Sequence, residues 1–125
     1  MEKVVNIEKC FAMFSDTFSP KIVGELNGQN VLLVRCEGDK VPWHIHDHED
    51  EMFFILEGTL DVLERDKCVT LNAGEFVIVR KGLEHRVVPK GHVKLMLFEP
   101  QGIAHTGNVK ADITLDRYER LEPEP

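Results

Sequence analysis

The sequence contains no long apolar run. No stretch approaches the roughly 18 apolar residues that a membrane-spanning helix needs. The first fifteen residues carry four charged side chains and lack the apolar segment, roughly seven residues or longer, that marks a secretory leader. We therefore expect neither a membrane span nor a leader. Internal repeats and low-complexity tracts are also missing.

Cysteine is scarce, and no two cysteines form a CxxC pair. Cys10, Cys36 and Cys68 are widely separated, which disfavours a zinc ribbon or a thioredoxin-type redox site. Free thiols suit a reducing compartment, so we expect a cytoplasmic protein. We also expect the three cysteines to behave as small buried apolar side chains.

Positive charge is in short supply as well. The 15 basic residues are outnumbered by 22 acidic ones, for a net charge of −7. An acidic chain repels a phosphate backbone, so nucleic acid is not an expected partner. The length of 125 residues, with 42% hydrophobic and 30% charged residues, is typical of one globular domain.

Short apolar runs separated by turn residues dominate the chain from Lys21 onward. Runs of this length, recurring about every eight to twelve residues, are typical of an antiparallel sandwich or barrel. The dipeptide Asn27-Gly28 predicts a hairpin. The expected strands cover residues 22–26, 31–36, 52–56, 59–63, 68–71, 76–79, 85–88 and 93–98.

One short helix is expected before the strands. Asn6 can cap residues 7–14, where Ile7, Phe11 and Phe14 recur at helical spacing. The last five residues or so are expected to fray. We divide the chain into an N-terminal segment (1–20) that packs on the barrel or a partner, a barrel (21–110) and an acidic tail (111–125).

Histidine and acidic residues gather between residues 44 and 51. Side chains two apart on a strand face the same side, so His44 and His46 can share one metal ion. Glu51 can join them only if the polar run 47–50 makes a turn. His85, which follows a glycine-containing turn at the start of a later strand, is the natural fourth ligand.

These two regions resemble the two motifs of the cupin family. The first motif, G-x5-H-x-H-x4-E-x6-G, is matched at every fixed position by Gly38, His44, His46, Glu51 and Gly58. The second, G-x5-P-x-G-x2-H-x3-N, is matched by Gly74, Gly82 and His85, with Arg80 and Pro89 in place of Pro and Asn. Phe98-Glu99-Pro100 and Thr106-Gly107-Asn108 are similar to stretches of small single-domain cupins.

The resemblance implies an all-β fold, a cupin-type antiparallel β-barrel (a double-stranded β-helix or jelly roll) with a short N-terminal helix. It also implies one divalent transition metal per chain and no organic cofactor. Three imidazoles and one carboxylate suit Mn, Fe, Ni, Co or Zn. The expected ligands are His44, His46, Glu51 and His85.

Two classes of function agree with such a site. One is a metalloenzyme, dioxygenase-like or an isomerase, that acts on a small oxygen-containing molecule. The other is a non-enzymatic protein that binds or senses a small ligand. A purely structural metal fits less well, because structural sites tend to be closed. The sequence identifies no general base outside the ligand set, which disfavours deprotonating isomerases.

Apolar residues on both faces of one strand predict a homodimer. Met52, Phe54 and Leu56 alternate with Phe53 and Ile55, so one set lines the barrel and the other needs a cover. The N-terminal aromatic side chains are candidates for that cover, by packing on a neighbouring chain. They are Phe11, Phe14 and Phe18.

The remaining candidates have plainer interpretations. His48 is expected in a solvated loop, and His92 and His105 have no partner at a useful spacing. Trp43 is expected in the core, as are Phe53 and Ile55, whereas Arg80 and Arg86 are expected at the surface. Metal affinity is expected to fall below about pH 6 as the histidines protonate, with Glu51 contributing only at lower pH.

Overall fold

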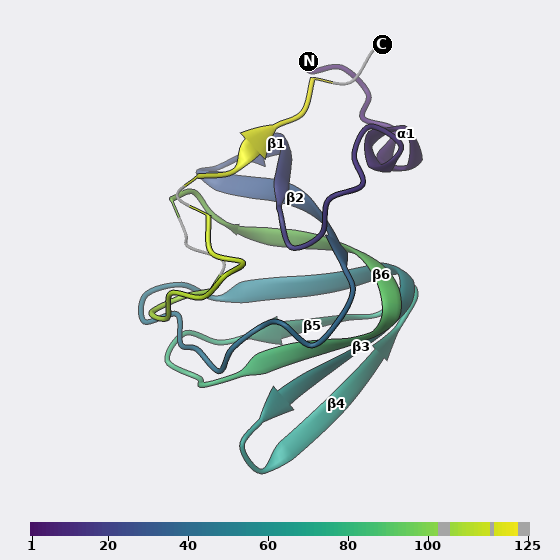
Figure 1. Cartoon of the computed structure of the whole chain (residues 1–125). Helices are drawn as coiled ribbons and strands as arrows, with labels where there is room; N and C mark the ends of the chain where they lie inside the picture. The colour runs from purple at the N-terminus through teal and green to yellow at the C-terminus, as the bar shows by residue number, and fades with distance from the viewer. Residues whose placement is uncertain (103–105, 116, 123–125) are drawn as a thin grey trace.

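The computed structural model describes residues 1–102, 106–115 and 117–122. Within these ranges strands dominate, and the expected all-β barrel with a short N-terminal helix is confirmed (Figure 1). The elements are α1 (Ile7–Phe11), β1 (Lys21–Leu26), β2 (Gln29–Cys36), β3 (Glu51–Glu64), β4 (Lys67–Asn72), β5 (Phe76–Val79), β6 (Arg86–Pro100) and β7 (Glu119–Arg120).

The two long strands β3 and β6 run antiparallel to each other at the centre of one seven-stranded sheet. The first half of β3 pairs with β5 and its second half with β4, while the later half of β6 pairs with β2. The sheet continues from β2 to β1 and β7, which lie with α1 at one end of the molecule (Figure 1). Beside the start of β6, an isolated antiparallel bridge joins His44 to His85.

Glycines with positive φ shape these strands. The expected hairpin turn is confirmed, because Asn27 and Gly28 have φ values of 51° and 78° between β1 and β2. The runs 52–56 and 59–63, expected as separate strands, are joined through Gly58, where φ is 90° and the register with β6 shifts. Glycine accepts this conformation, so the strand bends without ending. β6 likewise joins residues 86–88 to the run 93–98, and His85, expected in the first of these runs, lies just before the strand.

Side chains of β3 alternate between the barrel interior and its outer face. Phe53 and Ile55 are buried in the main core, as expected, whereas Met52 and Phe54 are half-buried on the outside. The main core also includes side chains from β2 and β6. The barrel interior is therefore largely apolar, and its buried polar side chains are described below.

A second, smaller core lies outside the barrel under α1. The Asn6 side chain caps this helix by accepting a hydrogen bond from the Lys9 N–H at 3.0 Å. The helix ends at Phe11, three residues before the expected end at Phe14. Phe14 lies beyond the helix, with its ring tilted against that of Phe11. Phe11 packs with Leu33 in this second core, and Phe18 lies in the main core. The expectation that these N-terminal side chains cover a neighbour is thus wrong for Phe11 and Phe18.

Part of the acidic tail is ordered against the barrel. Glu119 and Arg120 pair in parallel with Lys21 and Ile22, which makes the sheet mixed. Leu121 is buried, and its N–H donates to the Ile22 carbonyl oxygen at 3.0 Å. The expected fraying therefore does not begin at Leu121, and residues 123–125 lie outside the described ranges.

The cysteines follow the expectation in two cases out of three. Cys10 and Cys36 are buried, but Cys68 is exposed. It lies on β4, which among the described residues pairs with β3 and forms the end of the strand order. Across the described ranges, no helix has the length and apolar character that a membrane crossing requires.

Candidate metal centre

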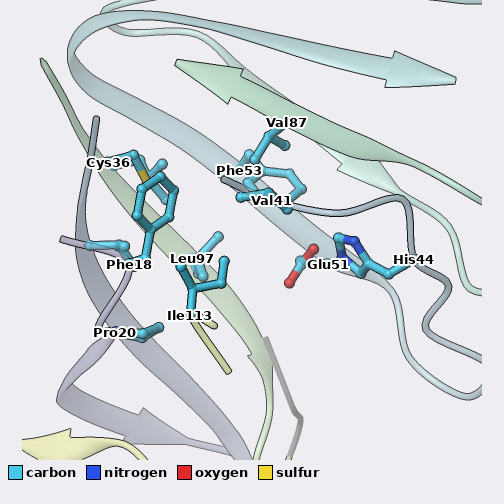
Figure 2. A pocket seen from close by; sticks show the side chains of 12 residues that line it. Phe18, Pro20, Cys36, Val41, His44, Glu51, Phe53, Val87, Leu97 and Ile113 are labelled. Carbon is cyan, nitrogen blue, oxygen red and sulfur yellow. The ribbon is translucent and has the colours of Figure 1, made fainter. Parts of the chain in front are cut away.

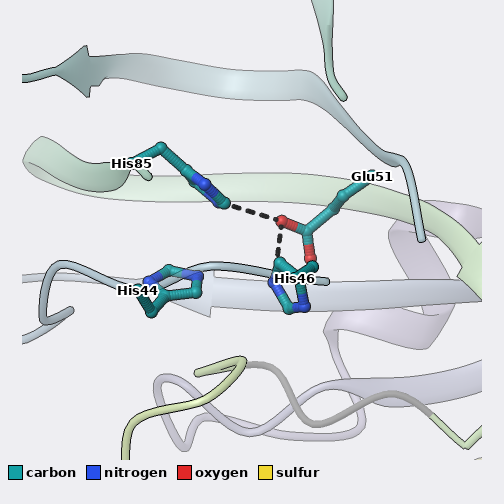
Figure 3. A group of neighbouring side chains, drawn as sticks. All are labelled: His44, His46, Glu51 and His85. Atoms are coloured by element: carbon teal, nitrogen blue, oxygen red, sulfur yellow. Dashed lines mark ion pairs between the residues drawn. The ribbon is translucent and has the colours of Figure 1, made fainter. Parts of the chain in front are cut away.

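Four polar side chains meet inside the barrel, although the surrounding core is apolar. One ligand-type atom of each lies within 4.8 Å of the corresponding atoms of the other three, and all four residues are buried (Figure 3). This His/Glu cluster consists of His44, His46, Glu51 and His85. The structure thus brings together the four residues named from the sequence.

The loop between His46 and β3 supplies the turn that Glu51 needs. Asp50 anchors this loop, since its carboxylate accepts hydrogen bonds from the Lys81 N–H at 2.9 Å and from the Arg80 guanidinium at 3.1 Å. The His46 carbonyl oxygen accepts from the Gly82 N–H at 2.9 Å. The loop is therefore tied to the turn before β6, which places Glu51 at the start of β3 on the same side as the histidines.

Backbone carbonyls set the tautomers of two histidines. His44 Nδ1 lies 2.8 Å from the Pro42 oxygen, and His85 Nδ1 lies 2.9 Å from the Leu83 oxygen. A carbonyl oxygen can only accept, so Nδ1 carries the proton in both rings. The lone pair then lies on Nε2, the nitrogen that a metal ion would use.

A carboxylate orients the third histidine. His46 Nδ1 donates to Glu49 Oε1 at 3.0 Å, and the Glu49 side chain is itself largely buried. A carboxylate on the far nitrogen of a ligating histidine fixes the ring and makes it a stronger ligand. All three imidazoles are therefore held from outside the cluster, with Nε2 left for the interior.

The charge state of the cluster is controlled by burial. Burial raises the pKa of Glu51 to about 7, an effect opposed by its contact with Glu99 and reinforced by the charge of Glu49. Burial lowers the pKa of His85. Both shifts favour the uncharged form of the group in the metal-free site.

The geometry of the cluster fits a metal ion. Glu51 Oε1 lies 3.6 Å from both His46 Nε2 and His85 Nε2, which is too long for a hydrogen bond. His85 Nε2 and Glu51 Oε1 are fully buried and have no hydrogen-bond partner among the described residues. Ligand atoms at about 2.0–2.2 Å from one ion can be this far apart. Neutral imidazoles with one carboxylate also suit a borderline divalent ion.

A loop after β6 also positions the cluster, which the sequence did not indicate. Asn108 accepts a hydrogen bond from the Ile45 N–H at 2.9 Å, and its own N–H donates to the Ile45 carbonyl oxygen at 3.2 Å. A Cβ on Gly107 would lie 3.0 Å from His44 Cδ2. The Thr-Gly-Asn stretch noted as a family likeness therefore supports the backbone between His44 and His46.

Glu99 is a second residue whose position the sequence did not indicate. It is buried near the end of β6, where its carboxyl group contacts that of Glu51. Burial and the neighbouring Glu51 raise the pKa of Glu99 well above its usual range. The sequence does contain a signal that could have identified Glu99: it is an acidic residue at the alternating position that Leu95 and Leu97 occupy on the inward-facing side of the strand.

The other histidines lie away from the cluster. His48 is exposed, as expected for a solvated loop. His92 is half-buried on the outer surface, where its Nε2 lies 3.0 Å from an Arg35 guanidinium nitrogen. Neither belongs to the His/Glu cluster, and His105 lies outside the described residues.

Trp43 differs from the sequence expectation. Its ring is half-buried and not in the core, with the Arg65 guanidinium 4.1 Å and the Arg86 guanidinium 6.0 Å from the ring centre. Arg86 forms an ion pair with Asp39. The exposed Arg80, which pairs with Asp50, is at the surface as expected.

Comparison with known proteins agrees with this geometry. The profile of the cupin domain family matches residues 34–106. A cupin-2 domain protein from Shewanella frigidimarina has a similar structure, with 39% identity, a TM-score of 0.76 and coverage of 78% of this chain and 95% of that one. A Neisseria meningitidis protein shows 28% identity and a TM-score of 0.71, covering 79% of this chain and 100% of that one.

Curated relatives share a shorter region. The uncharacterized protein YdbB of Bacillus subtilis is 35% identical over 65 residues, which cover 51% of this chain and 57% of YdbB. The chain spans about half the length of the curated relatives it matches. Each of these matches covers at least 51% of this chain.

Proposed function

This chain belongs to the cupin domain family, and from that premise we propose that its His/Glu cluster binds one divalent transition-metal ion and, through it, a small oxygen-containing molecule. The observation that carries the proposal is the convergence of four buried ligand atoms within 4.8 Å. The histidine rings are already oriented by Pro42, Leu83 and Glu49. Little side-chain ordering is then left for the metal to induce.

The chemistry that follows depends on charge and on open positions. When bound, a divalent ion supplies Lewis acidity and coordination positions that four protein ligands leave free. Three neutral imidazoles and one carboxylate leave the centre with a net charge of about +1. The cluster therefore favours a ligand with one negative charge on paired oxygens.

A non-enzymatic role is the second candidate, and the lining of the cavity beside the cluster favours it. The titratable side chains among the described residues that line this cavity are His44, Glu51 and Cys36. His44 and Glu51 belong to the cluster, which leaves Cys36. Burial raises the pKa of Cys36 to about 12, so its thiol does not act as a base at neutral pH. Chemistry that needs a separate proton acceptor is therefore poorly supported.

Metal analysis of the purified protein tests the proposal, followed by assays of oxygen uptake and ligand binding with small diols and 2-oxo acids. One ion per chain in the wild type, and its loss in His85→Ala, is the expected result. Oxygen uptake would identify an enzyme, whereas binding without turnover would identify a binding or sensing protein. A wild-type protein that takes up none of the five candidate metals would overturn both roles.

A further inference from the structure

A cavity extends from the His/Glu cluster into the barrel. Its volume is about 40 Å³, and its walls come from β2, β3, β6 and the loops that close the barrel. Glu51 and His44 lie at one end, and Phe18, Pro20 and Cys36 lie at the other (Figure 2). A ligand bound at the cluster would therefore direct its remaining atoms into this space.

The cavity carries no cation. Its lining residues, all within the described ranges, include neither lysine nor arginine. The buried Lys21 is instead bound to Asp16 at 2.8 Å and Glu119 at 3.0 Å. Arg35 donates to the Phe14 carbonyl oxygen at 3.0 Å. A second negative charge on the ligand would thus be buried without a partner, which is strongly unfavourable.

The part of the cavity that extends away from the cluster has apolar walls. Val41, Leu97 and Ile113 face the cavity between its two ends (Figure 2). The polar exception is Cys36, whose thiol is a weak donor and behaves mainly as a small apolar group. Alkyl carbons are accordingly the atoms that this space accommodates best.

The volume limits the size of the ligand. A cavity needs roughly 10–15 Å³ to hold one water molecule, and the volume of about 40 Å³ exceeds this, so a group of a few non-hydrogen atoms fits beside the cluster. A branched alkyl group such as isopropyl is of that size.

We propose that this site selects a small monoanion with paired oxygens at the cluster and a short, uncharged, branched alkyl tail in the cavity. The proposal rests on the proposed function, because the cluster must hold the metal that binds the paired oxygens. The selection of the tail is a property of the cavity walls. It can therefore fail while metal binding succeeds.

Isothermal titration of the full-length, zinc-loaded protein tests the selection, since Zn²⁺ is redox-inert and separates binding from turnover. Three 2-oxo acids share one chelating head: pyruvate, 3-methyl-2-oxobutanoate and 2-oxoglutarate. Each additional buried carbon strengthens binding about fourfold, so the branched acid, with two more carbons, should bind roughly 16-fold more tightly than pyruvate. The 2-oxoglutarate, with its second carboxylate, should bind more weakly than pyruvate.

A substitution that fills the cavity provides the second measurement. Cys36→Leu should keep the zinc content and the affinity for pyruvate but abolish the roughly 16-fold preference for the branched acid. Cys68→Leu is the matched control, because Cys68 is exposed and distant from the cavity lining. It should retain the preference.

The outcomes separate the two proposals. A protein that binds neither zinc nor any of the other four candidate metals would overturn the proposed function, and if it binds another of the five but not zinc, the same titrations are made anaerobically with that metal. Zinc binding with equal or reversed affinities for pyruvate and the branched acid would overturn the selection alone. Should Cys36→Leu fail to fold, the three wild-type titrations still decide the matter.

Discussion

His44 and His85 bond to each other through their backbones in both directions, with each N–H donating to the other's carbonyl oxygen at 3.0 Å. Their ring centres lie 4.4 Å apart. This isolated bridge brings the two motifs together. The separation of two imidazoles in the cluster is thus set by sheet pairing and not only by side-chain contacts.

The assignment of the ligands predicts that His85→Ala lowers metal affinity by at least about 100-fold, because it removes one of four ligands. His48→Ala is the control: His48 is also a histidine of this region but is exposed. Its affinity should match the wild type. Competition with a chromogenic chelator measures both. Equal affinities in the two variants would remove His85 from the site.

The contact between Glu49 and His46 predicts a smaller effect. Glu49→Ala removes the acceptor 3.0 Å from His46 Nδ1 and should weaken metal binding by about 10- to 100-fold. Asp47→Ala changes an exposed acid in the same loop and should leave it unchanged. If both substitutions weaken binding equally, the loss comes from the general negative charge of the loop and not from the hydrogen bond.

The close approach of Gly107 to the site predicts that Gly107→Ala disturbs metal binding. A Cβ there would lie 2.4 Å from the Ile45 carbonyl oxygen, so the backbone between two ligands must shift. Gly102→Ala is the matched control, since Gly102 has a similar positive φ but nothing within 4 Å of the added atom. Strain alone costs about 1–3 kcal/mol in each.

Thermal unfolding and metal titration distinguish the two glycine variants. Both should be less stable than the wild type, but metal affinity should fall only in Gly107→Ala. Unchanged affinity in that variant would show that the loop does not position His44.

The raised pKa of Glu51 predicts the pH dependence of metal binding. With a pKa of about 7, the metal-free carboxyl is protonated below neutrality, and a metal ion must displace this proton. Affinity should therefore fall about tenfold per pH unit below pH 7 from this group alone. His85, with its pKa lowered by burial, should add to the loss only at more acidic pH.

Metal titrations from pH 8 to pH 5 check this order. Glu51→Gln lacks the titrating carboxyl, so its weaker affinity should be flatter between pH 7 and pH 6 than that of the wild type. A wild-type affinity that is constant down to pH 6 would show that Glu51 is already ionised without the metal.

The outer face of β3 and β5 predicts self-association. Phe76 and Ile78 on β5 are 56% and 43% exposed, and they pair in register with Phe54 and Met52 on β3. Because α1 covers a different part of the sheet, we expect a second copy of the chain to cover this part. Phe76→Glu should convert a homodimer to a monomer in sedimentation experiments.

The control for self-association is Leu26→Glu, which changes a similarly exposed leucine (50%) on β1. It should leave the dimer intact. A wild-type protein that sediments as a monomer at micromolar concentration would contradict the expectation.

Local patterns determined much of this protein. The strands follow from short apolar runs, the first hairpin from Asn27-Gly28 and the helix start from the capping residue Asn6, because each depends on backbone preferences within a few residues. The identities of the cluster residues also follow from the sequence, since two histidines two apart on a strand share one face.

The tertiary structure decided what depends on distant partners. Whether Gly58 ends a strand or bends it depends on its packing against His92 and Val93, and the strand in the tail exists because Lys21 and Ile22 offer a free edge. Burial raised the pKa of Glu51, and a loop far along the chain brought Asn108 to Ile45. Burial and long-range pairing are properties of the assembled barrel, so no local pattern in the sequence encodes them.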